Sequence, residues 1–224
     1  MAEYFERVTP ITTVVEFYNK SVKNNKASLL KIYPDAFRIN RFRFSFANCD
    51  ASMKRVPNGS IDFYLEVEKA LVLAEDILSR QLKNDVANEV VERRKRSEKD
   101  GKEYKYAMPV RSYPGGLNAR KAKEKKIRTD GMAQARVLKI AGASSDKLDI
   151  IISCECGPGR ETKEGLIVPT YEYKPDTIVR VGITWEQARQ LAVMLKSHYD
   201  AYLSSCYTYD EFAYQKFLRE RNNG

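Results

Sequence analysis

Alternating cationic and aromatic residues in the first third of the chain have the chemistry needed to bind a polyanion. The segment 41–46 places three apolar rings on one side of an extended strand and two guanidinium groups on the other: Phe42, Phe44 and Phe46 against Arg41, Arg43 and Ser45. Guanidinium groups attract phosphates, and planar side chains stack on nucleobases without reading their identity. This pattern favours non-covalent binding of a nucleic acid.

The candidate binding residues are cations and tyrosines predicted on or near the sheet face that points away from the covering helix. In the first half of the chain they are Lys31, Tyr33, Arg38, Arg41, Arg43, Lys54, Arg55 and Tyr64. In the second half they are Lys139, Arg180 and one of Tyr171 or Tyr173. Arginine at alternate strand positions is also common on a solvated face, and Tyr33 and Tyr64 could pack at the rim of the sheet. Both interpretations stay open.

Residue types that carry out catalysis or hold metals are scarce. His198 is the only histidine, and it falls inside a predicted amphipathic helix. Cys154 and Cys156 would need two further ligands to bind a metal, so we expect reduced thiols. The glycine-rich segments 113–116 and 157–159 indicate turns and do not fit a phosphate-binding loop. We therefore expect no enzymatic activity, no cofactor and no metal site.

A repeated strand-then-helix pattern supplies the elements that would position the candidate residues. Strand 61–65 leads into a helix with a buried stripe, and strand 179–183 leads into another, with each position offset by 118 residues: Ala70, Leu73, Ala74 and Ile77 match Ala188, Leu191, Ala192 and Leu195. Upstream, residues 30–32 match residues 138–140 with an offset of 108, which predicts a longer loop inside the second copy. One helix cannot cover both faces of its sheet, so one face of each unit is left for function.

We predict an α+β fold in which two pseudo-repeated antiparallel β-sheet-plus-helix units pack together as a single domain over residues 1–224. The first unit spans 28–83 and the second spans 132–205. Between them, the segment 84–131 is predicted to be a basic linker, since residues 80–130 hold 16 Lys or Arg against 8 Asp or Glu. Its first part, to about Lys99, is predicted to extend the preceding helix, and the rest, with few apolar residues, to be a mobile linker or an excursion between the copies. Residues 206–224 form a C-terminal aromatic segment. Residues 10–24 are predicted to form a helix capped by Thr12 or Thr13, and residues 165–173 a strand.

The composition favours a negatively charged partner. The formal net charge is +9 at pH 7, and the chain holds 14 Tyr and 9 Phe. The charged start shows no signal peptide, and no apolar run is long enough to span a membrane, so we expect a cytoplasmic protein without a membrane partner. The tyrosines and phenylalanines after residue 200 exceed what one helix can bury on its own sheet, which favours a homo-oligomer, and a dimer first.

These elements resemble the architecture of the Whirly, Pur-alpha and positive-cofactor group of single-stranded DNA binders. The resemblance is carried by residues 60–80 and 177–197, preceded by 30–32 and 138–140. In that group each repeat is four strands followed by a helix, and nucleic acid lies along the sheets. The resemblance therefore implies strand binding on a sheet and association into dimers or higher oligomers. A weaker resemblance is to small proteins of bacterial mobile elements and phages.

The leading hypothesis is a non-catalytic single-stranded DNA-binding protein with low sequence specificity, acting in replication, recombination or conjugative transfer. RNA remains open as the ligand, because no residue pattern identifies a contact to the 2′-hydroxyl. One alternative is a regulator that binds duplex DNA or RNA through the basic run 93–96. Another is a protein-interaction module or inhibitor of phage or mobile-element origin, whose basic surface meets an acidic protein.

Overall fold

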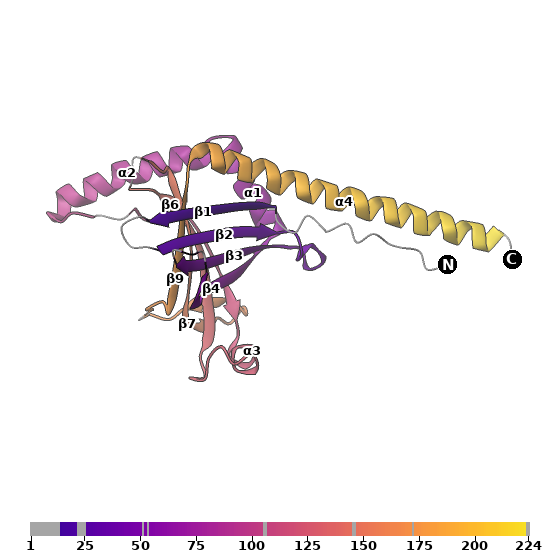
Figure 1. The fold of residues 1–224 in the computed structure, drawn as a ribbon, viewed down its shortest axis with the longest axis horizontal. Helices are drawn as coiled ribbons and strands as arrows, with labels where there is room; N and C mark the ends of the chain where they lie inside the picture. Colours follow the sequence, from indigo (N-terminus) through magenta and orange to yellow (C-terminus); the bar gives the residue numbers. More distant parts are fainter. Residues whose placement is uncertain are drawn as a thin grey trace.

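Two antiparallel sheets, each followed by a helix, form the body of the molecule (Figure 1). The computed structural model describes residues 14–21, 26–50, 52, 54–104, 107–144, 147–171 and 173–222. Sheet A has the order β1 (Val15–Ser21), β2 (Lys26–Tyr33), β3 (Arg41–Asp50) and β4 (Arg55–Glu66), with the short 3-10 helix η1 (Phe37–Ile39) between β2 and β3. The helix α1 (Val67–Leu78) follows β4 directly.

Sheet B repeats this order. It is built from β5 (Arg111–Leu117), β6 (Ala133–Gly142), β7 (Ile150–Glu161) and β9 (Thr177–Ile183), and α4 (Trp185–Asn222) follows β9. The short strand β8 (Ile167–Pro169) pairs with the far end of β7 and lies in the longer loop that the repeat offsets predict. The eight helix positions matched by the 118-residue offset are all buried. The predicted α+β fold of two sheet-plus-helix units is therefore confirmed.

The inner faces of the two sheets and the helices enclose one core. Phe42, Phe44 and Phe46 are at most 1% exposed, and they face α1 together with Leu30 and Ile32. Burying each such side chain contributes roughly 1.5–3 kcal/mol. In unit two, Ile150 and Ile152 hold the places of Phe42 and Phe44. The alternation read from the sequence thus assigns the faces of both sheets correctly.

The free edge of β9 lies across the inner face of sheet A, so the two sheets interlock. Asn48, Ser28 and Asn19, one from each of three strands, donate hydrogen bonds to carbonyl oxygens of β9 at 2.6–3.1 Å. In the opposite direction, Arg136 Nη1 of β6 donates to the Asp62 carbonyl of β4 at 2.7 Å. Figure 1 shows the strands of sheet B running across those of sheet A. These contacts satisfy edge groups that would otherwise be open to another strand.

The N-terminal helix predicted over residues 10–24 is wrong, because β1 occupies its described part. Val15 and Phe17 are buried while Glu16 and Tyr18 are exposed, which is the two-residue period of a strand. The apolar residues here fit a helical spacing equally well, and pairing with β2 decides the outcome. The proposed caps Thr12 and Thr13 lie outside the described residues.

The segment 84–131 joins the two units and is folded over most of its length. Its first part is helical, as predicted up to about Lys99, whereas the prediction of a mobile linker for the rest is wrong. It contains most of α2 (Gln81–Asp100), all of β5 and the short helix α3 (Ala119–Glu124). The segments 113–116 and 157–159, both predicted as turns, lie inside β5 and β7. Because β5 is an edge strand, Pro114 is tolerated there without losing a ladder hydrogen bond on both sides.

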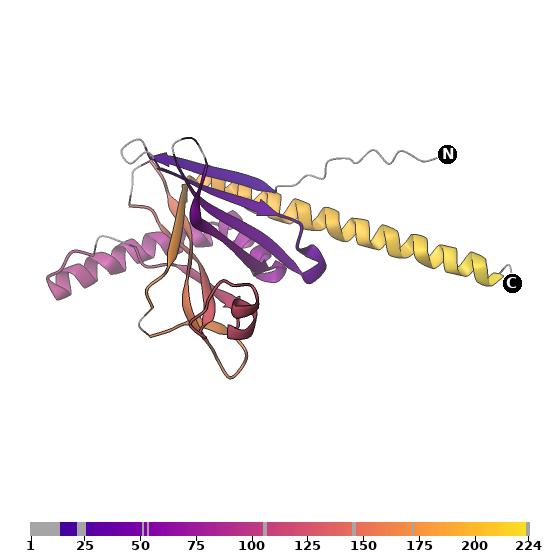
Figure 2. The same ribbon diagram turned by 60° about the horizontal axis from the view of Figure 1, so that its bottom comes forward.

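Two helices extend beyond the sheets. The 38 residues of α4 span about 57 Å, and the C-terminal half projects from the body, as Figures 1 and 2 show. The aromatic segment that begins at residue 206 continues this helix without a break. At the other side, α2 points away from the body in the opposite direction. Among the described residues, no helix combines the length and apolar composition that crossing a lipid bilayer requires.

Candidate nucleic-acid interface

The outer face of sheet A, opposite the buried phenylalanines, carries five of the predicted binding residues. They are Lys31, Tyr33, Arg41, Arg43 and Tyr64. The pairing register sets Tyr33, Arg43 and Tyr64 side by side in one row across β2, β3 and β4. Lys31, Ser45 and Asp62 form the next row. The sequence pattern therefore brings the intended side chains together, although carboxylates lie among them.

Arg43 is held in place by its neighbours. Its guanidinium carbon lies 4.0 Å from the centre of the Tyr33 ring, and its Nε donates to both carboxylate oxygens of Asp35 at 3.1 Å. Its Nη1 lies 3.8 Å from the Asp62 carboxylate. The hydrogen bond to Asp35 raises the pKa of Arg43 further above its usual value. Arg43 is thus a planar group in a stack, with much of its charge offset by Asp35.

Two more predicted cations are also paired with carboxylates. Lys31 lies 2.8 Å from Glu16 on β1, and Lys139 lies 2.6 Å from Glu155 on β7. These pairs are partly exposed, so each contributes little stability, but each lowers the positive potential of its face. The outer face of sheet A is therefore less cationic than the sequence pattern alone indicates.

The remaining predicted cations are exposed, and within the described part of the chain none of them lies within ion-pair distance of a carboxylate. These residues are Arg38, Arg41, Lys54, Arg55 and Arg180. Arg38 belongs to η1, at the end of sheet A near α4, and is not on the outer face. Arg41 and Arg55 lie at opposite ends of the β3–β4 pair.

The equivalent face of sheet B does not repeat this chemistry. Lys139 and Arg180 share a row there, but the position matching Tyr64 is Gly182, where any side chain would collide with Leu148. Neither tyrosine predicted for this sheet lies in a strand, because β8 ends at Pro169. Tyr171 is 96% exposed in a turn, whereas Tyr173 packs half-buried against Gly157.

A groove beside β4, which the sequence did not predict, joins the two units. It has a volume of about 500 Å³ and runs between the outer edge of sheet A and the β5, α3 and β8 region of sheet B. Five cations from separate segments line it: Arg41, Arg55, Lys69, Lys125 and Arg136. Asp62 and Glu66 also line it, so cations exceed carboxylates by three. These side chains converge only because the sheets interlock.

Aromatic rings and glycines shape this groove. Tyr64, 39% exposed, and Tyr113 line it, and burial raises the pKa of the Tyr113 phenol. Gly115 lies against the Phe63 ring, where an added Cβ would be 3.3 Å from a ring carbon. Gly116 has φ +145°, and a Cβ there would collide with the Gln134 carbonyl. The two glycines therefore let β5 approach both β4 and β6 closely.

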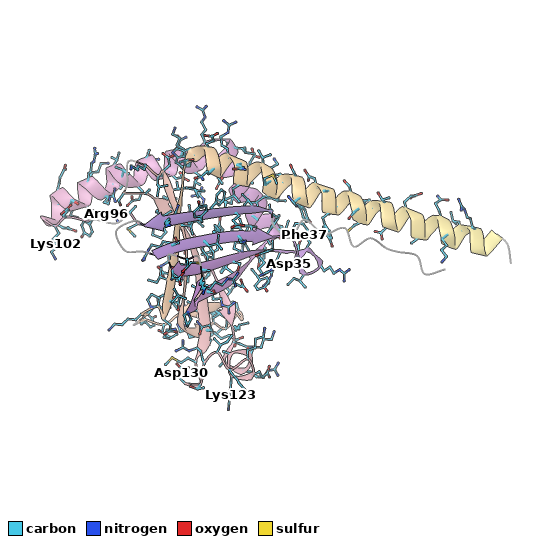
Figure 3. All side chains as sticks on the ribbon, in the orientation of Figure 1. Asp35, Phe37, Arg96, Lys102, Lys123 and Asp130 are labelled. Carbon is cyan, nitrogen blue, oxygen red and sulfur yellow. The ribbon has the colours of Figure 1, made fainter. Side chains whose placement is uncertain are left out.

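A cluster of exposed cations surrounds α3 beside the groove, and Lys125 of this cluster lines the groove. We call it the α3 rim, and it consists of Arg120, Lys121, Lys123, Lys125 and Lys126. The Asn118 side chain caps α3 by accepting a hydrogen bond from the Lys121 N–H at 3.0 Å. Figure 3 places Lys123 at the end of sheet B that is farthest from α1 and α4. This basic run is visible in the sequence, but the prediction of a linker over residues 84–131 gives it no position beside a binding surface.

The loops behind the α3 rim are fixed by Arg128. Its guanidinium is 11% exposed and forms ion pairs with Asp130 and, at 2.6 Å, with Asp176 just before β9. Its Nη1 also donates to the Gln134 side chain at 3.2 Å. Arg128 thus serves the structure and is not available to a ligand.

Metal and thiol chemistry find no support in the described residues. No group of three or more His, Cys, Asp or Glu side chains there converges as a metal site requires. Cys154 faces the core, and burial raises the pKa of its thiol. A thiol in this environment is a poor nucleophile.

No protein-family model matches the chain, and a comparison with curated proteins finds no match. A role for the groove therefore has to be argued from its own geometry.

Proposed function

We propose that this protein is a non-catalytic binder of single-stranded DNA that holds the strand along the outer face of sheet A and in the groove beside β4. The observation that carries the proposal is the groove, in which cations from three strands, one helix and one loop meet exposed tyrosine. Cations of this kind follow phosphates, and rings stack on bases. Neither interaction reads base identity, so we expect low sequence specificity.

Single strands fit this surface better than duplexes do. A tyrosine such as Tyr64 can stack only on a base that is not already stacked and paired inside a duplex. The alternative duplex-binding run 93–96 is less suited to phosphate contact, because Lys95 and Arg96 are paired with Glu92 at 2.7 Å and Glu89 at 3.1 Å. The order of four strands and a helix in each unit agrees with the proposed resemblance to the Whirly and Pur-alpha group.

A homodimer is part of this proposal. Among the described residues, no other helix or strand lies against the projecting half of α4 in Figures 1 and 2, and helices without packing are marginal in water. Pairing with a second copy would stabilise it. Light scattering should give twice the mass of one chain, and a concentration-independent monomer would remove the dimer from the proposal. The cytoplasm, and replication, recombination or conjugative transfer, are the proposed setting.

The direct test is an anisotropy titration with labelled single-stranded DNA, single-stranded RNA and duplex DNA of equal length, at two salt concentrations. We expect both single strands to bind more tightly than duplex, and affinity to fall steeply as salt rises. Preference for duplex would favour a regulator. No oligonucleotide binding, with salt-resistant binding of an acidic protein, would favour the protein-interaction module.

A further inference from the structure

A second pocket lies on the helix side of the molecule, between α1, the start of α2 and the start of α4. Its volume is about 590 Å³, within the range of pockets that hold small ligands or a few side chains. It is separate from the groove: Lys69 near the start of α1 lines the groove, whereas Ile77 near the end of α1 lines this pocket. The residues that line it are Ile77, Arg80, Lys83, Trp185, Glu186, Arg189, Gln190, Val193 and Met194.

The floor of the pocket is apolar. Ile77 is buried, Trp185 and Met194 are half-buried, and Val193 is 50% exposed on the first turns of α4. Trp185 is fixed by its backbone N–H, which donates to the Asp149 carboxylate at 2.8 Å. A floor of this kind can bury one bulky apolar side chain of a ligand, which is how peptide anchors usually gain affinity.

The rim of the pocket is cationic. Arg80, Lys83 and Arg189 are exposed there, and among the described residues no carboxylate lies within ion-pair distance of them. Of the described residues that line the pocket, only Glu186 is acidic. The rim is thus complementary to carboxylates that flank an apolar anchor.

Arg80 is held in a costly conformation at this rim. It joins α1 to α2 with φ +67°, a left-handed geometry that glycine or asparagine adopts more easily than other residues do. Arg80 is also the N-cap of α2, and no side chain caps that helix end. A carboxylate brought by a ligand could bind Arg80 at the N-terminal end of α2, where the helix dipole favours a negative charge.

We propose that this pocket binds an acidic peptide segment of a partner protein, with one aromatic or branched apolar side chain inserted over Trp185 and its carboxylates on Arg80, Lys83 and Arg189. A nucleic acid fits less well, because the floor is apolar and Glu186 would repel a phosphate chain. The pocket and the groove are distinct, so the protein could hold a strand and a partner at the same time.

The sole tryptophan of the chain gives a local readout, since Trp185 lines the pocket. The probe is a synthetic peptide of Asp and Glu residues with one Phe and one Leu, free of Trp and Tyr. We expect it to change Trp185 emission in a saturable way. Peptides with Lys in place of the acids, or Ala in place of Phe and Leu, should bind at least tenfold more weakly.

Matched variants locate the site. Arg80→Asn keeps a residue that tolerates the left-handed conformation, and combined with Arg189→Gln it should weaken peptide binding about tenfold. Arg94→Gln, exposed farther along α2, is the control and should leave binding unchanged. Val193→Asp places a charge on the exposed floor and should also weaken binding, which guards against a folding defect at residue 80.

Three results would overturn the inference: Trp185 emission unchanged by the acidic peptide, an equal response to the lysine peptide, or displacement of the peptide by single-stranded DNA. The variant Arg41→Ala with Arg55→Ala separates this site from the groove. It should bind the peptide normally even where it loses nucleic acid, so failure of one proposal leaves the other measurable.

Discussion

Asp35 limits the charge that Arg43 can offer to a ligand. Its carboxylate accepts hydrogen bonds from both Nε and Nη2 of Arg43, the shorter one at 2.5 Å. The ring of Tyr33 lies against the same guanidinium. Asp35→Asn should therefore release a cation on the outer face of sheet A. We expect tighter single-stranded DNA binding, with a salt slope steeper by about 0.7, as one added phosphate contact gives.

The measurement is an anisotropy titration across salt concentrations, with Glu98→Gln on the exposed side of α2 as the charge-matched control. The control should behave as the parent. An equal increase in DNA affinity for both variants would mean that only net charge matters and that Arg43 does not face the strand.

Asp130 makes part of the stability depend on pH. The hydrogen bond from Arg128 lowers the pKa of Asp130 to about 2, below the usual Asp value of about 3.9. A lowered folded-state pKa stabilises the protein above pH of about 4, and this stabilisation is lost as the pH falls through about 2. Arg128→Gln should lower the melting midpoint at pH 7. The difference in melting midpoint between variant and parent should shrink as the pH falls towards 2. A difference that stays constant over this range would contradict the assignment.

At the scale of elements, Arg111 of β5 fixes the bend between α1 and α2. It lies 2.7 Å from both Asp76 of α1 and Asp85 of α2, and all three side chains are about three-quarters buried. Arg111→Ala would leave two carboxylates facing each other without a cation. We expect a loss of about 2 kcal/mol in the free energy of unfolding, measured in urea.

The variant that also carries Asp76→Asn and Asp85→Asn should recover part of this loss, because it removes the repulsion. If Arg111→Ala unfolds at the same urea concentration as the parent, the bend is fixed by packing alone.

The sequence predicts the repeated units well, because two independent signals coincide at the same offset. The strand alternation and the helix stripe both repeat, and together they assign the inner faces of both sheets. The sequence does not predict β1, since Val15 and Phe17 fit a helix and a strand equally well. The sequence does not predict β5 either, because Pro114, Gly115 and Gly116 indicate a turn, although an edge strand tolerates these residues.

The groove could not be predicted for a different reason. Arg41, Lys69, Lys125 and Arg136 lie on separate elements of the chain, and only the interlocking of the sheets brings them to one place. The strand alternation predicts the cations on the outer face but not the carboxylates Glu16 and Asp35 that pair with them, because ion pairs between strands and loops depend on register.

At the scale of the whole molecule, the two units differ in the residues of their outer faces. Positions occupied by Arg43 and Tyr64 in unit one correspond to Ile151 and Gly182 in unit two, by the shared pairing register. Unit one thus carries the aromatic face, and the segment that joins the units carries the α3 rim beside the groove. The proposed binding surface requires both.

The salt dependence of single-stranded DNA binding tests this account most directly. Each phosphate contact contributes about 0.7 to the slope of log affinity against log salt. The variant Arg41→Ala, Arg55→Ala and Lys125→Ala should therefore flatten the slope by about 2, whereas Arg93→Ala, Arg94→Ala and Lys99→Ala on α2 should leave it unchanged. A groove variant with the parental slope, or a control that loses as much, would contradict the proposal that the strand lies beside β4.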